Sequence, residues 1–408
     1  MSWEKVKLSE TCSSIYDGDH NAPPKTDDGI PFITISNIDA ADGSIDFSAT
    51  AHVSQQYYES LKPERKARPG DVLYSVVGSF GVPSLVNEDR PFVFQRHIAI
   101  LRPGDRIEPE YLYYLMKNRD FYHWADSVAI GAAQRTVTLG QLREKLIDLP
   151  PLPTQQRIAG VLSAYDKLIE NNRRQIKLLE EAARRLYKEW FVDLRFPGHE
   201  TTPIHDGLPE GWKRDSLLGN IDYVRGRSYG SEDIRDTGAA RLINLNNVAS
   251  FGGWNAGAEK PYSGAHKKEQ VVKGGDIVMA VTDMTKERRL VGHVARIPKD
   301  ASGGIISMDL IKIVPKDMTP NYLYAHLRFS GVAEMIAMLA NGTNVIHLKP
   351  EALSRAILLI PSKDLQVAYA SYLQPVFDAI EASQQQITAA REARDRLLPK
   401  LMSGEIEV

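Results

Sequence analysis

A heptad pattern that occurs twice constrains the fold of this chain more than any other feature. Between Leu162 and Trp190, apolar residues recur at alternating steps of three and four, with Asn172 at one of these places. Such spacing is typical of a helix that packs lengthwise against another helix. The positions of this first seam are Leu162, Tyr165, Ile169, Asn172, Ile176, Leu179, Ala183, Leu186 and Trp190.

A second seam follows near the C-terminus, at each of these numbers plus 211. Its positions are Leu373, Val376, Ile380, Ser383, Ile387, Ala390, Arg394, Leu397 and Leu401. Arg394 is the one residue that does not suit an apolar seam, and Ser383 stands where the first seam has Asn172. These two polar residues either fix the register of a helix pair or are tolerated defects. The seams predict an antiparallel intramolecular coiled coil, because each helix leads out of its own domain toward the other.

The framework around each seam is repeated as well. Trp3 and Leu8 correspond to Trp212 and Leu217, and the strand-like and turn-like runs between them recur in the same order. The predicted fold is α+β, with two similar mixed α/β domains joined by two long helices in a pseudo-twofold arrangement. We place the first domain at residues 1–153, the first long helix at 154–196, a linker and the second domain at 197–361, and the second long helix with a tail at 362–408. Within the first domain, residues 110–124 have the periodicity of one amphipathic helix.

Length and composition indicate an ordinary globular protein with more than one domain. The chain has 408 residues, of which 43% are hydrophobic and 25% charged. Its formal net charge of −2 gives no general attraction to nucleic acid, so DNA binding would depend on local patches or on a basic partner. The single cysteine, Cys12, excludes an intramolecular disulfide and is expected to be a packed thiol. Because there is neither a signal-peptide pattern nor an apolar run of roughly 20 residues, we expect a cytoplasmic protein without a membrane partner.

No catalytic or metal-binding pattern stands out. The sequence has no GxxxxGK[S/T] phosphate loop, no GxGxxG before a helix, and no histidine spacing typical of a metal site. Asn21-Ala22-Pro23-Pro24-Lys25 is superficially similar to an amino-methyltransferase signature, but Ala22 and Lys25 break that signature, so we interpret the segment as a proline turn. Asp71 and Asp276 lie in matched turns, where a carboxylate is expected to bond the local backbone. We therefore expect no catalytic residue, metal or cofactor in this chain.

The ordered set of motifs resembles the DNA-specificity subunit of type I restriction-modification enzymes. Three motifs carry the resemblance: Pro-Gly-Asp-Val-Leu at 69–73 with its copy at 274–278, Leu-Pro-Pro-Leu-Pro-Thr-Gln-Gln-Arg-Ile-Ala at 149–159, and Leu-Pro-Glu-Gly-Trp at 208–212. The resemblance covers essentially the full length. It departs from the family pattern at residues 360–366, where the motif that begins the second long helix is eroded. Thr154 is the predicted N-cap of the first long helix.

The resemblance implies a non-catalytic subunit that gives a larger enzyme its DNA specificity. In that family, two target-recognition domains each read one half of a bipartite site in double-stranded DNA, and the paired helices set the spacing and dock two modification subunits. Those subunits bind S-adenosylmethionine and methylate adenine. The resemblance leaves open whether two restriction/translocase subunits, with ATP and Mg²⁺, join the complex. The first seam, about 28 residues or roughly 42 Å long, would separate two half-sites by roughly 10–12 base pairs.

Base readout requires side chains that bond base edges, such as Arg or Lys for guanine and Asn or Gln for adenine. Each candidate lies in a loop beside a framework point and has, as its alternative, an exposed loop position without DNA contact. The Lys286–Arg289 cluster favours a phosphate contact because its charges are grouped. The candidates are Ser36, Asn37, Ser79, Gln95, Arg96, His97, Gln134 and Arg135 in the first domain, and Asn244, Asn246, Asn247, Lys286, Arg288, Arg289, Asn344 and His347 in the second.

Two other classes of protein remain as alternatives. A coiled-coil scaffold without a nucleic-acid role would share the seams but gives no reason for two diverged domains at a fixed offset. A single-chain restriction and methylation enzyme would need the catalytic signatures that the sequence lacks.

Overall fold

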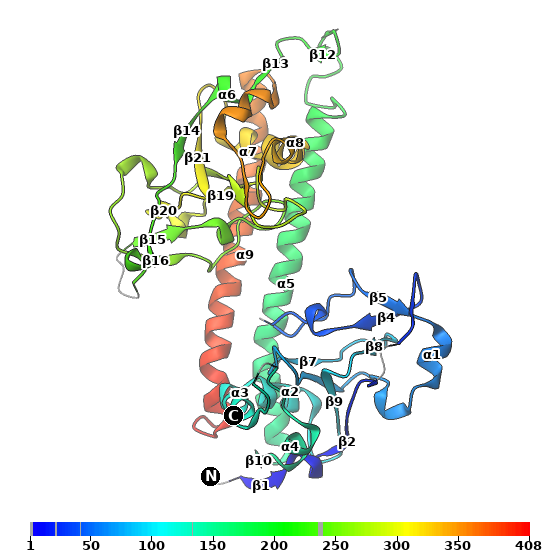
Figure 1. The fold of residues 1–408 in the computed structure, drawn as a ribbon. Coiled ribbons are helices and arrows are strands. Elements are labelled where there is room, and N and C mark those ends of the chain that lie inside the picture. Colours follow the sequence, from blue (N-terminus) through cyan, green and yellow to red (C-terminus); the bar gives the residue numbers. More distant parts are fainter. Residues whose placement is uncertain (1–2, 21–22, 41, 133, 236–239) are drawn as a thin grey trace. The chain divides into compact units, whose positions relative to one another are not determined.

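The chain divides into two compact units in the computed structural model, which describes residues 3–20, 23–40, 42–132, 134–235 and 240–408. Unit 1 comprises Met1–Ile169 with Ala389–Val408, and unit 2 comprises Glu170–Thr388. The two longest helices, α5 (Leu152–Phe191) and α9 (Lys363–Met402), each contribute one part to each unit (Figure 1). Asn21 and Ala22, which belong to the predicted proline turn, lie outside the described residues.

The described residues of unit 1 form three sheets. The main sheet has the strand order β2-β9-β6-β7 with antiparallel neighbours, and a second sheet has the order β3-β5-β4-β8, in which β4 and β8 are parallel. In the third, β1 pairs antiparallel with β10. The bounds are β1 (Glu4–Lys7), β2 (Cys12–Asp17), β3 (Lys25–Thr26), β4 (Ile30–Ile33), β5 (Ala51–Val53), β6 (Val72–Ser75), β7 (Pro83–Leu85), β8 (Val93–Phe94), β9 (Ile98–Pro103) and β10 (Leu146–Leu149).

Unit 2 repeats the strand order of the main sheet, whereas its second sheet, within the described residues, has no counterpart of β3. Its main sheet has the order β14-β21-β17-β19, its second sheet the order β16-β15-β20 with β15 and β20 parallel, and β13 pairs antiparallel with β23. β18 pairs with β22, and β11 and β12 form a small hairpin in the linker. The bounds are β11 (Ile204–His205), β12 (Leu208–Pro209), β13 (Lys213–Ser216), β14 (Ile221–Arg225), β15 (Ala240–Ile243), β16 (Lys260–Tyr262), β17 (Ile277–Ala280), β18 (Thr282–Asp283), β19 (Val294–Arg296), β20 (Ile305–Ile306), β21 (Leu310–Pro315), β22 (Ile346–His347) and β23 (Ile357–Ile360). The duplication inferred from the sequence is therefore present in the fold.

The shorter helices correct one prediction. Residues 110–124 form two helices rather than one, because Asn118, with ψ 140°, leaves the helical region between α2 and α3. The bounds are α1 (Gln55–Ser60), α2 (Pro109–Lys117), α3 (Arg119–Val128) and α4 (Leu139–Glu144) in unit 1, and α6 (Leu217–Asn220), α7 (Pro320–Phe329) and α8 (Val332–Met338) in unit 2.

The ends of α5 also differ from the prediction. This helix begins at Leu152, so Thr154 lies inside its first turn and is not the N-cap. Pro153 is tolerated there because N–H groups in the first turn of a helix have no intrahelical acceptor, so the N–H that proline lacks would not have formed a helix hydrogen bond. The helix ends at Phe191, five residues before the predicted end at 196.

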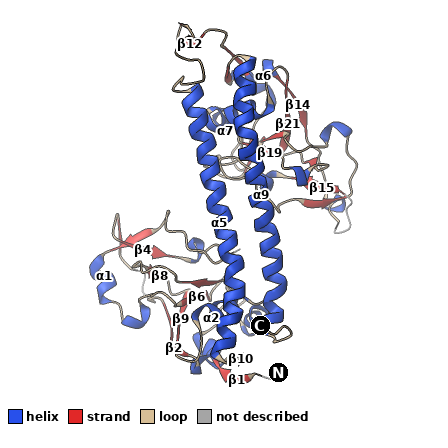
Figure 2. Ribbon diagram, turned by 180° about the vertical axis from the view of Figure 1, so that it is seen from behind, coloured by secondary structure: helices blue, strands red, loops and turns tan. Residues whose placement is uncertain are grey.

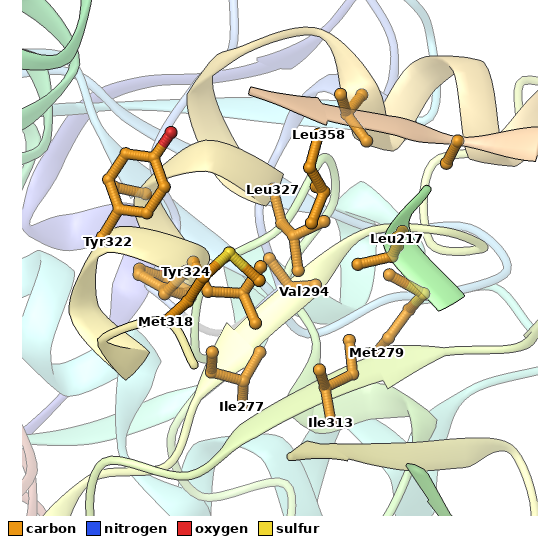
Figure 3. Packing of buried hydrophobic residues seen from close by; sticks show 14 of the residues in the cluster. Leu217, Ile277, Met279, Val294, Ile313, Met318, Tyr322, Tyr324, Leu327 and Leu358 are labelled. Carbon is orange, nitrogen blue, oxygen red and sulfur yellow. The ribbon is translucent and has the colours of Figure 1, made fainter. Parts of the chain in front are cut away.

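β17, an inner strand of the main sheet of unit 2, is buried on both faces, toward which its side chains point alternately. On β17, Ile277 and Met279 belong to one apolar cluster, whereas Val278 and Ala280 belong to another. Figure 3 shows the first cluster, in which side chains of the sheet pack with those of α6, α7 and β23. It includes Leu217, Ile277, Met279, Val294, Ile313, Met318, Tyr322, Tyr324, Leu327 and Leu358.

Within each unit, parts of α5 and α9 lie side by side (Figure 2). In unit 1, Arg157 donates to the Val408 carbonyl in the tail after α9, and Asp166 pairs with Arg394 of α9, so rising numbers on α5 meet falling numbers in the C-terminal segment. In unit 2, the ring centroids of Trp190 and Tyr369 lie 5.5 Å apart. Every position of both seams is buried or half-buried. The helices therefore form an antiparallel pair.

Candidate nucleic-acid interface

Four loop segments adjoin at one end of the main sheet in unit 1. The Val76 amide donates to the His97 carbonyl at 2.9 Å, and the Gly78 amide donates to the Arg135 carbonyl at 2.9 Å. Asp19 and Gln95 form a parallel bridge beside them. We call residues 18–19, 76–79, 95–97 and 134–136 the loop edge of unit 1.

The same four segments adjoin in unit 2. The Met308 amide donates to the Arg227 carbonyl at 2.8 Å, and the Val281 amide donates to the Asp309 carbonyl at 2.8 Å. β18 then pairs with β22, which places His347 opposite Thr282. We call residues 226–227, 281–284, 307–309 and 345–347 the loop edge of unit 2. Both edges are thus built by the same backbone connections but carry different side chains.

The loop edge of unit 1 holds six of the eight candidates that the sequence suggested there. The exposed ones are Ser79, Arg96, Gln134 and Arg135, and the half-buried ones are Gln95 and His97. Burial, and then the charge of Arg96, lowers the pKa of His97, which favours its neutral ring. Ser36 is exposed beside this edge, since it follows β4, whose Ile33 carbonyl accepts from the Gln95 amide.

Arg135 is the most constrained of these side chains. Its guanidinium pairs with Asp126 and lies 5.6 Å from the centroid of the Phe80 ring. Phe80 stacks in turn on Tyr122, with centroids 6.0 Å apart. The Arg135 side chain is still 44% exposed. The Phe80 ring therefore supports a guanidinium that remains accessible to solvent at the loop edge.

Three asparagine candidates brace loops. The Asn37 side-chain oxygen accepts from the Thr34 amide, and Asn247, 210 residues later, accepts in the same way from the Asn244 amide. Asn247 is fully buried, and buried Asn244 donates to the Ala258 carbonyl. We therefore no longer regard Asn37, Asn244 and Asn247 as candidates for base readout. Asn246 is exposed and remains a candidate.

The basic loop of unit 2 is held by a buried carboxylate that the sequence did not single out. Asp283 accepts from the backbone amides of Thr285, Leu290 and Val291. Its burial opposes ionisation, but these bonds outweigh that effect and lower its pKa. The anchored loop exposes Lys286 and Arg289.

Arg288 of the same loop points back into the protein. Its guanidinium donates to the Ala337 carbonyl at 2.6 Å, and its φ of 54° is left-handed. Arg288 therefore helps to hold the loop and leaves the proposed phosphate contacts to Lys286 and Arg289. Asn344 and His347 are exposed, the latter on the loop edge itself.

Away from the loop edges, matched polar residues hold the framework. Asp71 accepts from the Arg68 amide, and Asp276 accepts from the Lys273 amide, both at 2.9 Å, so the predicted turn-fixing role is confirmed. Arg102 also pairs with Asp71 at 2.8 Å. Burial raises the pKa of Cys12 to about 12, as expected for a packed thiol rather than a nucleophile.

The motif that begins each long helix contains a buried glutamine with a structural role. Gln155 donates to the Pro150 carbonyl at 2.8 Å and accepts from the Glu108 amide at 2.9 Å. Gln366, 211 residues later, donates to the Pro361 carbonyl and accepts from the Thr319 amide. The eroded second motif thus keeps the residue that ties the helix start to its unit.

In the described part of the chain, no group of three or more His, Cys, Asp or Glu side chains is arranged to hold a metal ion. None of the described helices is long and apolar enough to span a membrane.

Comparison with known proteins agrees with this arrangement. Residues 2–181 match the family described as type I restriction modification DNA specificity domain. The chain is 28% identical over 332 residues to the type I restriction enzyme MjaIX specificity subunit of Methanocaldococcus jannaschii, covering 75% of this chain and 71% of that protein. It is 26% identical to the putative type I restriction enzyme MjaX specificity subunit of the same organism, over all of this chain and 94% of the relative.

The fold is also similar to a solved structure. The type I restriction-modification system S subunit from M. genitalium superposes with a TM-score of 0.59 at 14% identity, over 98% of this chain and 96% of that one. Two domains joined by long helices are thus a shared architecture. The chain is thus similar, over its whole length, to specificity subunits of type I restriction enzymes.

Proposed function

We propose that this chain is the non-catalytic subunit that gives a type I restriction-modification complex its DNA specificity. One observation carries the proposal: two loop edges are built by the same backbone bonds but expose different polar side chains. Shared phosphate-type contacts give affinity, whereas differing base-edge contacts give sequence preference. Two such edges on one chain suit two unlike half-sites in double-stranded DNA.

The long helices supply the spacing in this proposal. α5 and α9 have 40 residues each, or about 60 Å at 1.5 Å per residue. Modification subunits that bind S-adenosylmethionine would dock on the chain and methylate adenine. The chain itself would contribute recognition alone, and its near-zero net charge suits a subunit that shares phosphate contacts with partners.

The test is to express the full chain with type I modification subunits in a host without adenine methylation and to map methylated adenines by single-molecule sequencing. We expect one bipartite motif with an unread gap. A contiguous motif, or no methylation by a complex that assembles, would overturn the proposal.

The variant Arg135→Ala tests whether the loop edge of unit 1, on which Arg135 lies, reads one particular half-site. We expect the specified bases to relax in one half-site while the other half-site is unchanged. Arg106 is a matched control, since its side chain is also 44% exposed and ion-paired, to Glu4, but lies outside the loop edge. If Arg135→Ala and Arg106→Ala both leave the motif intact, Arg135 has no reading role. A coiled-coil scaffold without a nucleic-acid role would give no sequence motif at all.

A further inference from the structure

One matched pair of loop-edge segments carries no candidate that the sequence suggested in either unit: Gly18-Asp19 in unit 1 and Gly226-Arg227 in unit 2. Both pairs follow the first strand of their main sheet. Asp19 bridges Gln95 in parallel, and Arg227 bridges Ser307 in parallel. The two pairs therefore occupy the same place in the repeated fold.

The glycine of each pair is required by close packing. A Cβ on Gly18 would lie 2.2 Å from the Phe94 carbonyl oxygen, and one on Gly226 would lie 1.9 Å from the Ser307 carbonyl oxygen. No side chain can be accommodated at either distance without moving backbone. The glycine thus allows the backbone to pack directly against the neighbouring turn, and this close packing fixes the backbone position of the next residue.

That next residue differs in charge between the units. In unit 1 it is Asp19, half-buried, whose carboxylate accepts from the Tyr57 hydroxyl at 3.0 Å and pairs with Arg65 at 3.4 Å. In unit 2 it is Arg227, which is exposed. Arg225, two residues earlier, pairs with Glu351 at 2.9 Å, whereas none of the described carboxylates pairs with Arg227.

The neighbour of Arg227 on the loop edge is apolar. The Arg227 amide donates to the Ile306 carbonyl at 2.7 Å, and the Met308 amide donates back to Arg227 at 2.8 Å. Met308 is 52% exposed, and it corresponds to Arg96 of unit 1. Unit 2 therefore presents one cation with a defined backbone position next to an exposed thioether, a combination suited to a base edge and an adjoining methyl group.

We infer that Arg227 is the specificity-determining residue of unit 2 and that its guanidinium donates to a guanine in the major groove of the half-site that this unit reads. Arginine is the side chain that binds the two acceptors of guanine in a bidentate manner. Met308 contacts the base step beside it. Asp19, the opposite charge at the matched place, prevents unit 1 from reading the same base. The inference rests on the proposed function.

The test is methylation mapping with the full complex carrying Arg227→Gln. Glutamine favours adenine, so we expect the preference of the complex for guanine at one position of one half-site to fall by roughly tenfold to a hundredfold. The preference for adenine at that position should rise. The other half-site and the gap should not change. Arg227→Lys should keep the preference for guanine in weakened form.

The matched control is Arg214→Gln, which removes the same charge from exposed β13, a strand of a different sheet. A uniform loss of methylation with an unchanged motif would make Arg227 a phosphate contact and overturn the inference. An unchanged rate and motif would overturn it as well. If the wild-type complex gives no bipartite motif, the proposed function fails first, so the two failures are distinguishable.

Discussion

A buried histidine is one residue by which the repeated units differ. His326 of α7 is completely buried, whereas Leu115 stands 211 residues earlier in α2. The ring of His326 bonds the Tyr187 hydroxyl at 2.7 Å through Nδ1. Burial lowers the pKa of His326 to about 4, because a charged imidazolium would be desolvated there.

This shift predicts that unit 2 loses stability in acid. The folded pKa of His326 lies below its unfolded value of 6.5, so the contribution to stability is present above pH 6.5 and is lost as the pH falls toward 4. The loss should reach about 3 kcal/mol near pH 4. Urea unfolding of the full chain at pH 7.5 and 4.5 measures it.

The double variant Tyr187→Phe/His326→Leu should remove most of this dependence, because both polar partners are replaced by apolar groups. Tyr187→Phe alone keeps the buried imidazole and serves as the control. If both variants show the full wild-type loss, His326 is not its source.

At the scale of elements, the helix pair of unit 1 contains a polar cluster whose matched places in unit 2 are apolar. Arg394, 5% exposed, pairs with Asp166 of α5, and the Tyr114 hydroxyl donates to the same carboxylate at 2.7 Å. The matched places in unit 2 hold Ala183 and Phe377, both buried. Arg394, the residue that did not suit the apolar seam, is therefore accommodated by its ion pair with Asp166, 228 residues away in the chain.

Breaking this ion pair should destabilise unit 1. Asp166→Leu leaves a buried guanidinium with only the exposed carboxylate of Asp395, and we expect a loss of about 3 kcal/mol in unfolding free energy. Asp166→Leu/Arg394→Met should recover more than half of that loss, since an apolar pair suits the seam. Thermal unfolding of the full chain compares them, and Arg396→Ala, in an exposed pair with Glu392, is the control. A double variant less stable than Asp166→Leu would contradict this account.

The elements that could be predicted from the sequence are those set by local periodicity and repetition. The seams predicted the two long helices, and the matched offsets predicted a duplicated fold. The break at Asn118 could not be predicted, since its neighbours continue an apolar periodicity. The loop edges depend on backbone pairing between residues as distant as Gly78 and Arg135, so the sequence found Arg135 by type but missed Arg227 and Asp283. Asn247 was misjudged because residue type alone does not reveal burial.

At the scale of the whole molecule, the central claim is that two reading units are joined by a spacer of fixed length. α5 passes from unit 1 to unit 2 after Ile169, and α9 passes back after Thr388. Removing residues 170–176 and 382–388 deletes one heptad from each helix, takes out Asn172 and Ser383 together, and preserves the period of both seams. Each helix shortens by roughly 10 Å, or about 3 base pairs of B-DNA.

The most direct measurement is single-molecule mapping of adenine methylation by complexes that contain the wild-type chain or this shortened chain. We predict that both half-sites keep their specified bases and that the unread gap between them becomes about 3 base pairs shorter. An active shortened complex that methylates the original motif with its original gap would contradict the account.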